Sequence, residues 1–352
     1  MLQFLTYLFI AIYTATVIGI ILVVILGNRN PLKTIPWVVV LIFAPVVGLV
    51  FYFFFGQDLR RKRIISRRTY KRLMVYALPA HVRRSDAPVP AACQSLSTLL
   101  TNTSQAVSFY GSRLTHYGDG ASKMTALLEE IEKARDHIHI LYYIFCDDET
   151  GARLQQALIR KAKEGVKVRV LYDDVGCNGV KKEFFQQMRD AGAEVHALLH
   201  VRFPMLTDRV NYRNHRKIVV IDGRVGFFGG MNIADRYVEG TKWGTWRDTH
   251  LRIEGPAVRG LQLLFAVDWS YECKEVLSDS RFFPPVADKG KSGIQIAPGG
   301  PIGEWSNIAM LFLKAITNAK KNVYIQTPYF LPTESLVKAL QTAALAKVDV
   351  RL

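Results

Sequence analysis

The sequence predicts an α/β protein, with a mixed sheet flanked by helices and preceded by a two-helix transmembrane hairpin. Two uncharged apolar runs stand near the N-terminus, and helical and strand patterns alternate over residues 124–199. An Asp-Gly pair then joins two apolar strands within residues 216–229, which is typical of a β-hairpin. The 352 residues can hold one large or two small domains, and the apolar half of the composition is ample for a core.

The first apolar run, residues 1–27, carries no charged side chain and is long enough to cross a bilayer. It has no positively charged residues at its N-terminal end and no small-residue cleavage site, so we expect a retained helix rather than a signal peptide. The second run, residues 35–57, is also uncharged. Pro36 fits its first turn, and Pro45 is expected to kink its middle. A buried soluble helix is the alternative for this second run.

The basic character of the chain is concentrated directly after the second run. The formal net charge is +16, and ten positive residues without any acid occupy residues 60–84, namely Arg60, Arg61, Lys62, Arg63, Arg67, Arg68, Lys71, Arg72, Arg83 and Arg84. The link between the two apolar runs holds only two positive residues, so the positive-inside rule predicts a multi-pass membrane protein with the remainder of the chain in the cytoplasm. We expect the basic segment to lie against anionic headgroups, at about 1 kcal/mol for each residue. A merely solvated segment is the alternative.

The rest of the chain divides into short helices and strands. Residues 87–112 resemble a connector with one short helix at 93–100. The patterns that follow predict helices at 124–134, 151–163, 181–191 and 256–271, and strands at 137–146, 166–172, 194–199 and 246–253. Such alternation favours a largely parallel sheet, to which the Asp-Gly hairpin adds antiparallel strands.

Four widely spaced cysteines, Cys93, Cys146, Cys177 and Cys273, include no Cys-x-x-Cys pair. This spacing argues against a zinc site and against a disulfide framework, and it fits a reducing compartment.

The predicted hairpin carries the residues with the clearest chemistry. His215 and Lys217 are two positions apart, so on a strand they project to the same side, roughly 6 to 7 Å apart. A neutral imidazole can attack phosphorus, and an ammonium neutralises the phosphoryl oxygens. Gly230 allows the backbone to approach an anion, and the Asn232 amide can donate to one. Asp222 lies at the turn and, by strand parity, points away from His215.

The spacing His215-x-Lys217, four residues, Asp222, six residues, Gly229-Gly230-x-Asn232 resembles the signature of the phospholipase D superfamily. The resemblance implies that His215 forms a covalent phosphohistidine, that Lys217 and Asn232 hold phosphate, and that Asp222 is the aspartate of the motif. It implies neither a metal nor another cofactor.

Three other acids and two tyrosines are further candidates. The resemblance places an acid near Asp248, which could orient the His215 imidazole, although a salt bridge with Arg247 or Arg252 explains it equally well. Asp173 and Asp174 end a predicted strand and could line a cleft or form a turn. Tyr142 and Tyr143 are more typical of a core than of a substrate site.

The chain also contains an internal repeat. Residues 131–145 align without gaps on residues 316–330, and residues 165–171 recur loosely at 347–352. The same offset predicts a second motif near position 400, past the last residue of this sequence. In the superfamily two such motifs face each other, and one histidine protonates the leaving group, so this chain alone is expected to be a poor catalyst. The expected domains are a membrane hairpin (1–58), a basic segment and connector (59–118), a first lobe (119–300) and the start of a second lobe (301–352).

The whole chain resembles the bacterial cardiolipin synthase family, through the motif together with Asn30-Pro31, Thr34, Phe55-Gly56 and residues 246–249. The resemblance implies phosphatidyl transfer between two phosphatidylglycerol molecules. Its implied partners are this anionic phospholipid and the membrane, with no nucleic acid expected and the oligomeric state open. The alternatives are a phospholipase D-type hydrolase, a membrane-tethered endonuclease and an inactive lipid-binding fragment.

Overall fold

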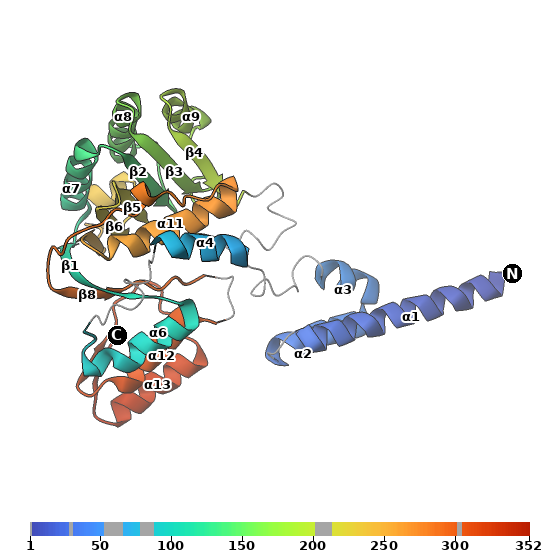
Figure 1. The fold of residues 1–352 in the computed structure, drawn as a ribbon. Helices are drawn as coiled ribbons and strands as arrows, with labels where there is room; N and C mark the ends of the chain where they lie inside the picture. The colour runs from blue at the N-terminus through green and yellow to red at the C-terminus, as the bar shows by residue number, and fades with distance from the viewer. Residues whose placement is uncertain (1, 28–30, 53–65, 78–87, 201–212, 301–304) are drawn as a thin grey trace. The chain divides into compact units, whose positions relative to one another are not determined.

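The computed structural model describes residues 2–27, 31–52, 66–77, 88–200, 213–300 and 305–352, which fall in two compact units (Figure 1). One unit contains the N-terminal helices, and the other contains the sheet, its helices and the C-terminal part of the chain.

The N-terminal unit contains α1 (Leu2–Gly27), α2 (Pro31–Phe43) and α3 (Pro45–Phe51). Among the described residues, α1 is the one helix long and apolar enough to cross a membrane, over Gln3–Leu22. The predicted second span is broken between α2 and α3, because the ring of Pro45 and its missing N–H disfavour a continuous helix. The kink expected at Pro45 is therefore confirmed, while the end of that predicted span, residues 53–57, lies outside the described residues.

The basic segment contributes one described helix, α4 (Arg67–Ala77), which packs on α11 (Val258–Cys273). Leu73 and Ala77 are fully buried against α11, and the Arg259 guanidinium donates to the Ala77 carbonyl at 3.4 Å. The apolar side of α4 is thus used inside the protein, and Arg68, Lys71 and Arg72 are left exposed. The other basic residues of the segment lie outside the described side chains.

The second unit is built on an eight-stranded sheet with strand order β4-β3-β2-β5-β6-β7-β1-β8. Its strands are β1 (Ser108–Tyr117), β2 (His137–Tyr142), β3 (Lys167–Asp173), β4 (Glu194–Leu198), β5 (Ile218–Ile221), β6 (Val225–Gly229), β7 (His250–Glu254) and β8 (Ser292–Gln295). Only β2, β3 and β4 pair in parallel, and every other neighbouring pair is antiparallel. The mixed sheet is confirmed, and the expectation that it is largely parallel is wrong.

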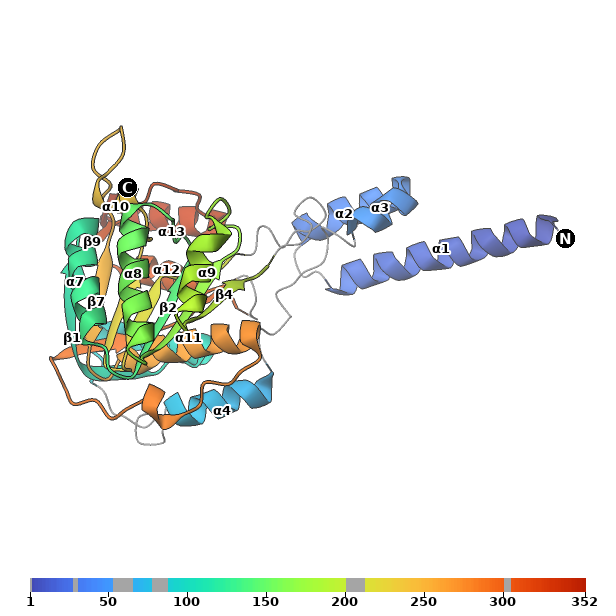
Figure 2. The same cartoon turned by 90° about the horizontal axis from the view of Figure 1, so that it is seen from above.

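Helices cover both faces of this sheet (Figures 1 and 2). One face is packed against α7 (Gly120–Lys133), α8 (Glu149–Lys163) and α9 (Lys182–Asp190), and the other against α11. Successive residues of β5 alternate between the two apolar cores, which explains why the strand is continuously apolar.

Two strands were not predicted. β1 begins at Ser108, inside the predicted connector, and β8 pairs beside it. Seven of the ten residues of β1 are exposed or only partly buried, in an irregular pattern, so the sequence lacks the alternation that identifies a strand. The short helix of the connector is confirmed as α6 (Gln94–Ser104).

The C-terminal residues form α12 (Asn307–Asn318), β9 (Asn322–Tyr324), α13 (Glu334–Leu345) and β10 (Asp349–Arg351). β9 and β10 pair in parallel across α13, as β2 and β3 pair across α8. The structure therefore confirms the internal repeat as two βαβ units, each preceded by a helix, α7 or α12.

Candidate active site

The Asp222-Gly223 turn closes the β5–β6 hairpin as predicted. Both residues have positive φ, 51° and 62°, as a type I′ turn requires, and the Arg224 N–H donates to the Ile221 carbonyl at 3.0 Å. The Asp222 carboxylate accepts backbone N–H groups at 2.8 to 2.9 Å, from Arg135, Asp136 and His137. Asp222 therefore fastens the hairpin to the start of β2, at the opposite end of β5 from His215.

His215 and Lys217 meet on one aromatic ring. The His215 imidazole stacks on Tyr143 with centroids 3.7 Å apart, and the Lys217 ammonium lies 5.5 Å from the centroid of the same ring. The ammonium also donates to the His215 carbonyl at 2.6 Å. Both residues precede β5 rather than belonging to it, so Tyr143, at the end of β2, brings them together.

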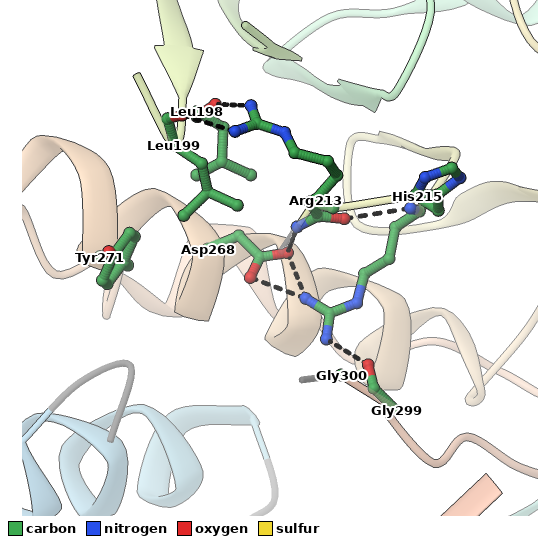
Figure 3. Close-up of a pocket in the computed structure, with 10 residues that line it drawn as sticks. Leu198, Leu199, Arg213, His215, Asp268, Tyr271, Gly299 and Gly300 are labelled. Atoms are coloured by element: carbon green, nitrogen blue, oxygen red, sulfur yellow. Dashed lines mark hydrogen bonds and ion pairs between the residues drawn. The ribbon is translucent and has the colours of Figure 1, made fainter. Parts of the chain in front are cut away.

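The segment that carries His215 is anchored by two ion pairs. The Arg213 guanidinium pairs with Asp173 at 2.9 Å. It also donates to the Leu199 carbonyl at 2.9 Å (Figure 3). Arg216 donates to both oxygens of Asp268, at 2.7 and 2.5 Å. Both carboxylates are buried, so the ion pairs hold the backbone on either side of His215 in place.

A cavity of about 310 Å³ opens beside His215 (Figure 3). Its lining residues come from β4, the His215 segment, α11 and the chain after β8, and they are Leu198, Leu199, Arg213, Asn214, His215, Arg216, Asp268, Tyr271, Gly299 and Gly300. Because both of its arginines are already paired with carboxylates, the cavity offers leucine, tyrosine and backbone surface rather than free positive charge.

The glycine and the amide of the motif lie at the ends of β6 and β7. A Cβ atom on Gly230 would approach Asp248 Oδ1 to 2.0 Å, so only glycine allows this carboxylate so close to the backbone. Asn232 is buried, with Oδ1 accepting the Ile144 N–H at 3.1 Å and Nδ2 donating to the Tyr237 hydroxyl at 2.6 Å. Its orientation is fixed, and one amide hydrogen is left for an anion.

The charges of the site favour a neutral imidazole beside a cation. Burial and then Lys217 lower the pKa of His215 below its ordinary value, although Asp173 opposes them. Burial lowers the pKa of Lys217 to about 8, and Asp248 opposes this shift. Near pH 7 the His215 imidazole is therefore unprotonated, and Lys217 is still charged in most molecules.

The structure separates the predicted site residues into two sets. His215, Lys217, Asn232, Gly230 and Asp248 lie at one end of the β5, β6 and β7 strands. Asp222 lies at the other end. No hydrogen bond joins Asp248 to His215 in residues 213–300, so Asp248 as the orienting acid stays a prediction.

Two features of the candidate site were not predicted from the sequence. Tyr143 was considered a core residue, and the pairing of Arg213 with Asp173 was not foreseen. The two aspartates at the end of β3 were the available signal, since strand ends commonly face a site in α/β sheets.

Comparisons with known proteins show which family this chain resembles. A family model described as "Cardiolipin synthase, PLD-like domain" matches residues 127–245, and one described as "Phospholipase_D-nuclease N-terminal" matches residues 14–57. The chain is 39% identical to the cardiolipin synthase of Geobacillus kaustophilus, over 98% of this chain and 70% of that protein. It is 38% identical to the major cardiolipin synthase of Bacillus subtilis, over 94% of this chain and 71% of that protein.

Among solved structures, the phosphatidylserine synthase of Haemophilus influenzae is similar in fold, with a TM-score of 0.54 and 16% identity. The likeness covers 74% of this chain and 65% of that structure.

Proposed function

This chain belongs to the cardiolipin synthase family, and from that premise we propose that His215 carries a phosphatidyl group from one phosphatidylglycerol to the hydroxyl of another. A ring nitrogen of His215 attacks the phosphorus of the first lipid, and the bond from phosphorus to the headgroup glycerol breaks. The hydroxyl of the second lipid then attacks the phosphorus, the phosphorus–nitrogen bond breaks, and cardiolipin is formed.

The observation that carries this proposal is the meeting of His215 and Lys217 on the ring of Tyr143. Stacking fixes the plane of the imidazole, its lowered pKa leaves it unprotonated, and the ammonium stands where it can neutralise phosphoryl oxygens. The same arrangement would be of little use to a protein that only binds lipid.

The remaining residues of the motif have supporting roles in the proposal. Lys217 and the free amide hydrogen of Asn232 bind the phosphate, and Asp248 keeps Lys217 charged from its place against Gly230. Asp222 acts at a distance by fastening the hairpin to β2. The proton for the departing glycerol comes from the histidine of the second motif, which the internal repeat predicts near position 400. The same histidine, now neutral, takes the proton of the attacking hydroxyl in the second step.

The N-terminal helix α1 fits membrane anchoring, and we extend this to a two-pass anchor with the catalytic part in the cytoplasm. The uneven distribution of Arg and Lys around the two apolar runs supports this orientation. An anchor of this kind keeps the site at the layer where phosphatidylglycerol headgroups lie.

An endonuclease is the less favoured alternative. Nucleic-acid binding depends on arginine and lysine side chains that are free to meet phosphates. Arg213 and Arg216, the two arginines beside His215, are both held by buried carboxylates.

The decisive experiment uses phosphatidylglycerol labelled with ³²P and the full chain in mixed micelles. We expect acid-labile label on the wild-type protein, none on His215→Asn, and undiminished label on His116→Asn, a matched change at an exposed histidine of β1. Labelled phosphatidic acid without cardiolipin would favour the hydrolase. A wild-type chain that binds lipid but takes up no label would overturn the proposal.

A further inference from the structure

A short turn projects from the lobe between α10 (Asp235–Val238) and β7, beyond the end of α10 (Figure 2). Within it, the Thr241 N–H donates to the Gly244 carbonyl at 2.8 Å and the Gly244 N–H donates back to Thr241 at 2.9 Å. Gly240 and Gly244 have φ values of 90° and 126°, which favour glycine. The two residues at the tip, Lys242 and Trp243, are therefore held in a defined turn, which we call the 241–244 turn.

The tip presents a large aromatic side chain to solvent. Trp243 is 86% exposed, and the ammonium of Lys242 lies 4.8 Å from the centroid of its ring. A tryptophan at a protein surface usually has its ring covered, because the indole is the largest apolar side chain. Its apolar body and single N–H instead suit the boundary between lipid and water, where tryptophan is enriched.

The charge around the turn is complementary to an anionic surface. Lys242, Arg236 and Arg247 are exposed, and Glu239 is the exposed acid among residues 236–247. Each positive residue near an anionic leaflet contributes about 1 kcal/mol of attraction. An anionic bilayer is the surface that fits best, because the substrate of the proposed reaction is itself a bilayer lipid.

The turn is connected to the site at both of its ends. Trp246 packs on Tyr237 with centroids 5.3 Å apart, and the Tyr237 hydroxyl accepts the amide of Asn232 at 2.6 Å. On the other side, the chain reaches Asp248, which lies against Gly230. A bilayer surface that binds the turn therefore also keeps Asn232 and Asp248 at a fixed distance from that surface.

We propose that the 241–244 turn is an interfacial anchor, in which Trp243 enters the headgroup layer of an anionic bilayer and Lys242 meets its phosphates. The anchor presents the His215 site to lipid in the same leaflet. The inference rests on the proposed function, because a site that takes a bilayer lipid needs a surface that reaches the bilayer.

The kinetic test compares two substrates with the full chain and follows ³²P transfer to His215. One substrate is long-chain phosphatidylglycerol diluted in vesicles, and the other is dihexanoyl phosphatidylglycerol dissolved as monomers. Trp243→Ala should reduce kcat/KM on vesicles about tenfold, mainly through KM, corresponding to about 1.4 kcal/mol. The loss on the monomeric lipid should be much smaller. Trp305→Ala is the matched control, a 51% exposed tryptophan before α12 that should leave both rates unchanged.

A physical test follows the position of the indole directly. In vesicles containing lipids brominated along the acyl chain, Trp37 of the proposed membrane anchor and Trp243 should both be quenched in the wild-type protein. Trp243→Phe should remove its own share of the quenching, and Trp305→Phe should leave the quenching unchanged. Equal losses of Trp243→Ala on both substrates, or quenching unchanged by Trp243→Phe, would overturn the anchor and favour a protein partner for the turn. Quenching that depends on Trp243 in a chain without transfer activity would overturn the proposed function and leave the anchor standing.

Discussion

The two copies of the internal repeat have the same local fold and very different surroundings. In the first copy, β2 lies between β3 and β5, and both of its faces are buried. In the second copy, β9 pairs with β10 in a two-stranded sheet, and Tyr324 of β9 is exposed. A shared sequence pattern therefore determines the βαβ unit, while the strands and helices that pack on that unit determine how far its strands are buried.

The hairpin of β5 and β6 adds the candidate site to the first copy. It lies beside β2 and brings His215 onto Tyr143. The offset of 185 residues places Pro328 at the position of Tyr143 in the second copy. Within the described residues, β9 pairs with β10 alone, so no strand lies on its second edge.

The largest difference between the two copies should appear in the free energy of unfolding. Phe145 is fully buried against the rings of Phe184 and Phe185, whereas its counterpart Phe330 is 43% exposed. Phe145→Ala should lower the free energy of unfolding by about 3 to 5 kcal/mol, and Phe330→Ala by less than about 1 kcal/mol. Thermal unfolding in detergent micelles measures both. Equal effects would show that the second copy is as well packed as the first.

The next effect concerns catalysis and should be confined to the first copy. Lys217→Met removes the ammonium that meets the phosphoryl oxygens, so phosphohistidine formation should slow by about 10² to 10³. Lys321→Met, at an exposed lysine before β9, is the control and should keep the wild-type rate. Single-turnover labelling measures the rate, and similar losses in the two variants would contradict a specific role of Lys217 in phosphohistidine formation.

A third test exchanges one residue between the copies. Lys123 is fully buried, burial lowers its pKa to about 7, and Ile308 stands at the corresponding position. The unfolded state binds the proton more strongly, so the lysine destabilises the fold most below pH 7 and progressively less toward pH 10.5. Lys123→Ile should therefore raise the unfolding free energy by about 1 to 3 kcal/mol at pH 6.

The pH dependence of this gain is the check on its cause. Unfolding midpoints of Lys123→Ile and wild type should converge as the pH rises from 7 to 10. A gain that is the same at every pH would point to better packing by isoleucine instead.

The smallest predicted effect is the change of the transfer rate with pH. Because Lys217 has a pKa of about 8, transfer should fall about tenfold between pH 7 and pH 9, and protonation of His215 should limit it below the ordinary histidine pKa. Lys217→Arg keeps its charge at pH 9, so the alkaline decline should disappear, at a lower overall rate. A decline that persists in this variant would assign it to another group.

Local patterns predicted the parts of the fold that depend on neighbouring residues. The Asp222-Gly223 pair predicted a hairpin because few residue pairs adopt two positive φ angles, and both φ values are positive in the structure. The apolar periodicity of α7 and α8 and the apolar run of β3 likewise predicted their elements. β1 was missed and the sheet was expected to be largely parallel, because irregular exposure and strand direction depend on which strands become neighbours.

The sequence by itself determined the chemistry of this protein: an imidazole and an ammonium two positions apart before a hairpin, an anchor-like apolar start, and a repeated βαβ unit. Only the tertiary structure decided what surrounds that chemistry. Tyr143 and Asp173 reach the His215 segment from β2 and β3, and Asp268 reaches it from α11. Contacts between such distant segments follow from strand order and helix packing, which no local pattern of side chains encodes.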